Sequence, residues 1–198
     1  AMRAVDSFAS APLASSLPSA VPIDARRIVY CGHSMGGHGA WVAAVQGVSR
    51  ALGVASVSGW TKKETYGDSN FLFDQSVNDI STSYVEPALE GVLRASIGDN
   101  DLELHLPVLR NVPHLARVGD ADNTVHPFWA RRIQRLLESY DGLSPRQTQH
   151  RSKLSELHGK EHWWWDTHRE NDGGALNDDE MRTFFAGTLG ATPRTRPS

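Results

Sequence analysis

A glycine-rich turn constrains this sequence more than any other feature. The turn reads Gly32-His33-Ser34-Met35-Gly36 and matches the pattern G-x-S-x-G. A β-prone run at 27–31 leads into it, and a helix-prone stretch with small residues at its start, 35–45, leads out. A strand-to-helix turn this sharp holds its serine in a strained backbone conformation, and side chains at the two glycine positions would clash. The pattern therefore predicts a strand, a tight turn and a helix, with the Ser34 hydroxyl exposed at the carboxyl edge of a sheet.

Strand and helix signals alternate along the rest of the chain. Short β-prone runs lie at 54–58, 112–118 and 150–157. A helix with a 3.6-residue period begins at Pro127, and Asn177 with Glu180 resembles a capping box for a last helix at 178–189. Strands that alternate with helices indicate an α/β fold with a mainly parallel sheet.

We expect a single domain over residues 1–190. Four segments lie outside its regular alternation: a helix end at 1–9, a connecting loop at 10–22, a helical or lid-like insertion at 60–105 with a helical patch at 85–97, and a disordered tail at 191–198. The segment 60–105 is expected either to lie over the site as an insertion or to form a helical excursion.

The composition excludes several classes of protein. With 198 residues, 39% of them hydrophobic, the chain is long enough for one domain with a core. A net charge of −3 excludes a strongly basic nucleic-acid binder, and the single cysteine, Cys31, excludes a disulfide framework or a cysteine-based zinc cluster. No run approaches the ~18 apolar residues of a membrane span, so no membrane partner is expected. The sequence shows no secretory signal and assigns no compartment.

A serine in such a turn is a candidate nucleophile. The amide of Met35 would point to the same spot as one oxyanion-hole donor, and the start of the helix favours a developing negative charge. A phosphate-binding loop is the alternative, but the segment lacks the lysine of a P-loop and the spacing of a dinucleotide fingerprint. A near match at 47–51 lacks both flanking elements. We therefore interpret Ser34 as a nucleophile, which needs an acid and a base.

The acid and the base of such a serine are expected further along the chain, in the order Asp or Glu and then His. Asp120 and Asp122 both follow the strand candidate at 112–118. We favour Asp122, because its place in the turn would let its carboxylate accept from a histidine N–H. Asp120 is better explained as a turn residue that bonds local backbone.

The candidate bases are His150, His158, His162 and His168. We favour His162, because the three tryptophans after it would wall the imidazole and exclude water; His158 is the second choice and His168 the third. The tryptophans suit either core packing or an apolar or aromatic substrate group, which makes Trp163 and Trp164 candidate substrate contacts. No H-E-x-x-H or similar spacing is present, and neither a metal nor an organic cofactor is expected.

Three blocks together resemble the catalytic domain of prolyl-oligopeptidase-like serine peptidases. They are CGHSMGGHGAW at 31–41, VPHLARVGDADNTVHPFWARRI at 112–133 and HGKEHWWWD at 158–166. Their order and spacing resemble the Ser, Asp and His segments of that family. The resemblance implies an α/β-hydrolase fold with Ser34 as nucleophile, Asp122 as acid and His162 as base. Esterases and lipases share this fold, so the motifs do not separate a peptidase from an esterase.

The chain departs from that family before the first strand. The family has several strands, a helix, the loop of the second oxyanion donor and, in its peptidases, a propeller ahead of the elbow strand, whereas 26 residues precede Arg27 here. We therefore expect a sheet of about four strands with one uncovered edge and a missing N-terminal half as a partner. The expected function is a serine hydrolase acting on a peptide or a small ester through an acyl-enzyme. The alternative is a non-catalytic interaction module built on the truncated fold.

Overall fold

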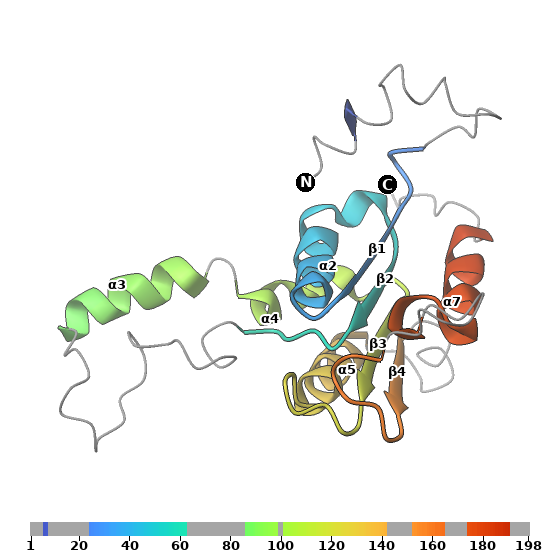
Figure 1. The fold of residues 1–198 in the computed structure, drawn as a ribbon. Coiled ribbons are helices and arrows are strands. Elements are labelled where there is room, and N and C mark those ends of the chain that lie inside the picture. The colour runs from blue at the N-terminus through green and yellow to red at the C-terminus, as the bar shows by residue number, and fades with distance from the viewer. Residues whose placement is uncertain are drawn as a thin grey trace.

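The described residues form a four-stranded parallel sheet with helices on both faces. The computed structural model describes residues 6–7, 24–62, 86–98, 101–141, 152–164 and 174–190. The strands are β1 (Ile28–His33), β2 (Ala51–Val57), β3 (His114–Gly119) and β4 (Ser152–Leu157), and they lie in the order of the chain. All neighbouring pairs are parallel, so every carboxyl end lies at one edge of the sheet, the lower edge in Figure 1.

The helices separate into two layers. On one face lie α2 (Met35–Gln46), α4 (Leu102–His105), the 3₁₀ helix η3 (Leu106–Leu109) and α5 (Phe128–Asp141), whereas α7 (Asp179–Gly190) covers the other face (Figure 1). The strands show the period of two that this arrangement needs. Val54 packs in the core under α2 and α5, and its neighbour Ala55 packs against α7. The remaining elements are α3 (Pro87–Gly98) and the 3₁₀ helices η2 (Val48–Arg50) and η4 (Gly174–Leu176).

The expected α/β fold with a mainly parallel sheet is confirmed, with small shifts in the element ends. The first strand continues past the predicted run to His33, and the second begins three residues earlier than predicted. The patch predicted at 85–97 is helix α3. Of the predicted insertion at 60–105, the end at Leu102 is buried in the main core, whereas residues 63–85 and 99–100 lie outside the described residues. The connecting loop predicted at 10–22 and the tail predicted at 191–198 also lie outside the described residues.

The last helix begins one residue later than predicted, and the predicted capping box is wrong. Asp178, rather than Asn177, caps α7, because its Oδ1 accepts the amide of Met181 at 3.0 Å. Glu180 does not reach back to the cap. Its carboxylate instead forms ion pairs with the fully buried Arg117 of β3 (3.2 Å) and with Lys153 (2.5 Å). Contacts between α7 and the sheet therefore determine where this helix starts.

A buried histidine at the amino end of β3 makes stability depend on pH. The His114 ring contacts the carbonyl oxygen of Val112 (Nδ1, 3.3 Å) and the hydroxyl of Ser152 (Nε2, 2.7 Å), and burial lowers its pKa from 6.5 to about 4. A His whose pKa falls on folding stabilises the protein fully above its unfolded pKa, and that stability is lost as the pH falls towards the folded pKa. Between pH 7 and 4.5 we expect His114 to account for a loss of roughly 2 kcal/mol in the free energy of unfolding.

Urea unfolding of the wild type and of His114→Gln at both pH values measures this loss. The expected result is that the variant loses less stability than the wild type on acidification. An equal loss in both proteins would contradict the assignment to His114.

Candidate active site

Ser34 lies at the turn between β1 and α2, in the backbone conformation that the motif predicts. Its φ of 57° and ψ of −120° lie outside the regions that L-residues favour. The Ser34 amide donates to the carbonyl oxygen of Val57 at 2.8 Å, which ties the turn to the end of β2. The strained serine therefore stands at the carboxyl edge of the sheet.

The two glycines of the motif have different roles. A Cβ atom on Gly32 would lie 2.1 Å from the carbonyl oxygen of Gly36, a distance that no side chain tolerates. A Cβ atom on Gly36 would meet nothing within 4 Å. The expectation that both positions exclude side chains is therefore right for Gly32 and wrong for Gly36. It is the backbone of Gly36 that leaves no room for a side chain on Gly32.

Three of the predicted site residues lie in one hydrogen-bonded line. Nε2 of His162 is 3.0 Å from Oγ of Ser34, and Nδ1 of His162 is 2.9 Å from Oδ2 of Asp122. Since a carboxylate only accepts, Nδ1 carries a proton, and Nε2 of a ring with that single proton accepts the serine hydroxyl. Asp122 and His162 are 1% and 3% exposed, and the other carboxylate oxygen of Asp122 accepts the amides of Thr124 (2.9 Å) and Val125 (2.7 Å).

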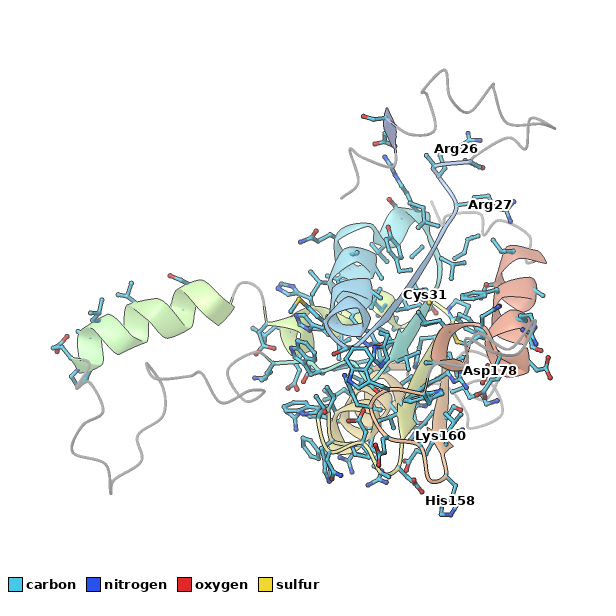
Figure 2. The ribbon with its side chains drawn as sticks, viewed as in Figure 1. Arg26, Arg27, Cys31, His158, Lys160 and Asp178 are labelled. Carbon is cyan, nitrogen blue, oxygen red and sulfur yellow. The ribbon has the colours of Figure 1, made fainter. Side chains whose placement is uncertain are left out.

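The rejected pair, Asp120 and His158, is also hydrogen-bonded, but away from the serine. Nδ1 of His158 lies 2.8 Å from Asp120, which also accepts the amide of Gly159 at 2.7 Å and whose pKa is held below its usual value by His158. The side chain of His158 is completely exposed and points away from the sheet at the tip of its loop (Figure 2). Asp120 therefore bonds the neighbouring backbone amide of Ala121, as the sequence predicts, and in addition the histidine loop, which the sequence does not predict.

The loops that carry Asp122 and His162 contact each other closely. The amide of Ala121 donates to the carbonyl oxygen of Lys160 at 3.0 Å, and a Cβ atom on Gly119 would lie 2.1 Å from that same oxygen. Glycine at the end of β3 thus lets the acid loop approach the base loop. Figure 2 shows Lys160 in this loop, beyond the end of β4.

Met35 is the first residue of α2, so its amide has no partner within the helix and lies at the positive end of the helix dipole. This is the place at which the sequence predicts an oxyanion-hole donor. The Met35 side chain is 74% exposed beside the serine.

The two tryptophans predicted as substrate contacts differ in exposure. The Trp163 side chain is 65% exposed, and its ring centroid lies 4.9 Å from that of His162. Trp164 is partly buried. The sequence did not predict the aromatic contacts behind the acid loop: the Trp60 ring stacks on that of His38, with centroids 5.3 Å apart, and Trp60 also packs against Val125 in that loop.

His33 is a residue of the site that the sequence analysis did not single out. Its Nε2 lies 2.8 Å from the carbonyl oxygen of His162, and the two ring centroids are 4.7 Å apart. Burial lowers the pKa of His33. The only sequence signal was its position next to Ser34, because its partner lies 129 residues away.

Within the part of the chain that the structure describes, no group of three or more His, Cys, Asp or Glu side chains could hold a metal ion. None of the described helices is long and apolar enough to cross a bilayer.

Comparison with known proteins identifies the fold. No family model and no curated protein sequence matches the chain. Among solved structures, an S-formylglutathione hydrolase from Agrobacterium tumefaciens matches with a TM-score of 0.53 and 21% identity over 93% of this chain. A puromycin-hydrolyzing peptidase from Mycobacterium tuberculosis matches with 0.53 and 18% over 92%, and a monoacylglycerol lipase from Paleococcus ferrophilus with 0.50 and 18% over 95%.

The chain has the α/β-hydrolase fold. It spans 57% of the S-formylglutathione hydrolase chain, 25% of the peptidase and 72% of the lipase. The matched proteins cleave different bonds, so the likeness identifies the fold and does not choose among substrates.

Proposed function

We propose that this protein is a serine hydrolase that cleaves ester or peptide bonds through an acyl-enzyme. The observation that carries the proposal is the line from Ser34 through His162 to Asp122, with hydrogen bonds of 3.0 and 2.9 Å. Acyl transfer requires a nucleophile, a base within reach of it and an acid that orients the base. The buried position of the acid and the base gives the line a fixed geometry.

In this mechanism the Ser34 oxygen attacks the substrate carbonyl while Nε2 of His162 takes the serine proton. Asp122 holds the ring in the tautomer that accepts at Nε2 and stabilises the imidazolium that forms. The amide of Met35 donates to the oxyanion of the tetrahedral intermediate. His162 then gives its proton to the leaving alcohol or amine, and a water molecule, activated by the same ring, releases the acyl group and regenerates Ser34.

A second oxyanion donor is not identified among the described residues. The proposal is that it comes from a segment packed beside β1, which is an edge strand of the described sheet. Loss of one such donor costs about 10²–10³ in kcat, so its contribution is large.

We also propose that Trp163 contacts an apolar group of the substrate, because its exposed ring flanks His162. Trp163→Ala is expected to raise KM for p-nitrophenyl octanoate about tenfold, which corresponds to about 1.4 kcal/mol of lost contact, and to change KM for the acetate ester much less. Trp163→Phe, which keeps an aromatic face, is the matched control. Equal changes for both esters would contradict a contact with the acyl chain.

Labelling by a fluorophosphonate probe tests the proposed function, because the probe reacts with a serine only where a base activates it. The expected result is one label at Ser34 in the folded wild type, located by peptide mass spectrometry and lost in Ser34→Ala. A chain that circular dichroism shows to be folded, yet takes up no label, would contradict the proposal and favour the non-catalytic interaction module.

A further inference from the structure

We propose that His33 is a positioning residue that holds the base of the active site in line with the nucleophile; this inference rests on the proposed function. His33 is the last residue of β1, and Ser34 follows it directly. Its ring extends to the loop after β4 and contacts the backbone of His162. One side chain thus connects the strand that carries the nucleophile to the residue proposed as its base.

The direction of this hydrogen bond defines what His33 must supply. A carbonyl oxygen only accepts, so Nε2 of His33 carries the proton and donates to the His162 carbonyl at 2.8 Å. The His162 ring makes its own two hydrogen bonds to Ser34 and Asp122. The bond from His33 fixes the backbone from which that ring extends, so backbone and ring are held at three points.

The contacts around His33 limit its movement. Its ring centroid lies 4.7 Å from that of His162, 4.9 Å from Trp163 and 6.1 Å from Trp164. Other hydrogen bonds of the base loop, such as that of the Lys160 carbonyl with Ala121, join it to the acid loop. His33 joins it instead to the nucleophile strand, so it governs the distance between Ser34 and His162.

The charge state of His33 suits the same role. Burial lowers its pKa, so the ring stays neutral near pH 7. A second cation beside His162 would disfavour the imidazolium that forms when this ring takes the serine proton. A neutral N–H donor fixes the loop without that repulsion.

Two substitutions separate the donor from the bulk of the ring. His33→Gln keeps an N–H group close to the position of Nε2, whereas His33→Leu keeps apolar volume and removes the donor. Because a small misplacement of a catalytic group costs about 10²-fold, we expect His33→Leu to lower kcat for p-nitrophenyl acetate roughly 10- to 100-fold with little change in KM. His33→Gln is expected to stay within about threefold of the wild type. His158→Gln, at the exposed tip of the same loop, is the matched control and keeps full activity.

Proton NMR gives a second readout that does not depend on turnover. The proton between His162 and Asp122 is expected to give a far-downfield resonance, which His33→Leu broadens or shifts and His33→Gln preserves. Equal losses in the two variants, or none in His33→Leu, would overturn the positioning role. If the wild type takes up no fluorophosphonate, the proposed function is contradicted. The NMR resonance in the two variants then tests the positioning role of His33 independently of labelling.

Discussion

Replacing His162 by alanine is expected to lower kcat/KM by about four to six orders of magnitude, whereas the same change at His158 lowers it by less than about twofold. Both histidines lie in the loop after β4, and each is hydrogen-bonded to an aspartate of the loop after β3. Only His162 reaches Ser34, at 3.0 Å. The two pairs therefore form a control within one molecule, because they have the same chemistry and differ in their distance from the serine.

The corresponding changes to the acids extend this comparison. Asp122→Asn leaves the shape of the side chain and favours the wrong tautomer of His162, so we expect kcat to fall by about 10⁴. Asp120→Asn is expected to leave kcat within about twofold. Initial rates with p-nitrophenyl acetate and the rate of fluorophosphonate labelling measure all four variants. A large effect of Asp120 or His158 would move the proposed base to the exposed pair.

Alanine at Gly32 and alanine at Gly36 are expected to have effects of opposite sign on stability. The new Cβ at Gly32 meets the carbonyl oxygen of Gly36 at 2.1 Å, so the turn has to open. We expect a loss of about 3 kcal/mol or more in the free energy of unfolding, together with loss of labelling at Ser34. At Gly36 the Cβ meets nothing within 4 Å and lies in α2. Alanine favours a helix over glycine, so a gain of about 0.5–1 kcal/mol is expected there.

Urea unfolding followed by circular dichroism gives both free energies, and fluorophosphonate labelling reports the state of the turn. Gly39, which also lies in α2 with open space around its Cβ position, gives a second control for the gain from helix propensity. Destabilisation by Gly36→Ala of the same size as that by Gly32→Ala would contradict the distinction between the two glycines.

The sequence predicted those features that depend on short stretches of chain. The strand, turn and helix around Ser34 are local, and the alternation of the remaining elements was enough to predict an α/β fold with a parallel sheet. The choice of Asp122 and His162 over their near neighbours also came from local position. The structure brings these three residues within hydrogen-bond distance, and their catalytic role stays a prediction until it is measured.

The features that the sequence did not predict depend on contacts between distant segments. The cap of α7 moved by one residue because Asp178 and Glu180 both contact the buried Arg117 of β3. The hydrogen bond of His33 to the His162 carbonyl joins residues 129 positions apart, and no helical or strand periodicity predicts such a contact. Turn propensity predicted the local backbone bond of Asp120 but not its partners His158 and Gly159 in another loop. Local patterns hold no information about such pairs.

The strand order β1-β2-β3-β4 has a consequence for a chain that is being synthesised. Ser34 emerges early, yet the ring that contacts its hydroxyl lies 128 residues later. Domains acquire their long-range contacts late, after the intervening chain has been closed into a loop. Under the proposed function, the serine therefore stays an ordinary alcohol until β4 and the loop after it dock, and an incomplete chain that ends before residue 162 is expected to take up no fluorophosphonate.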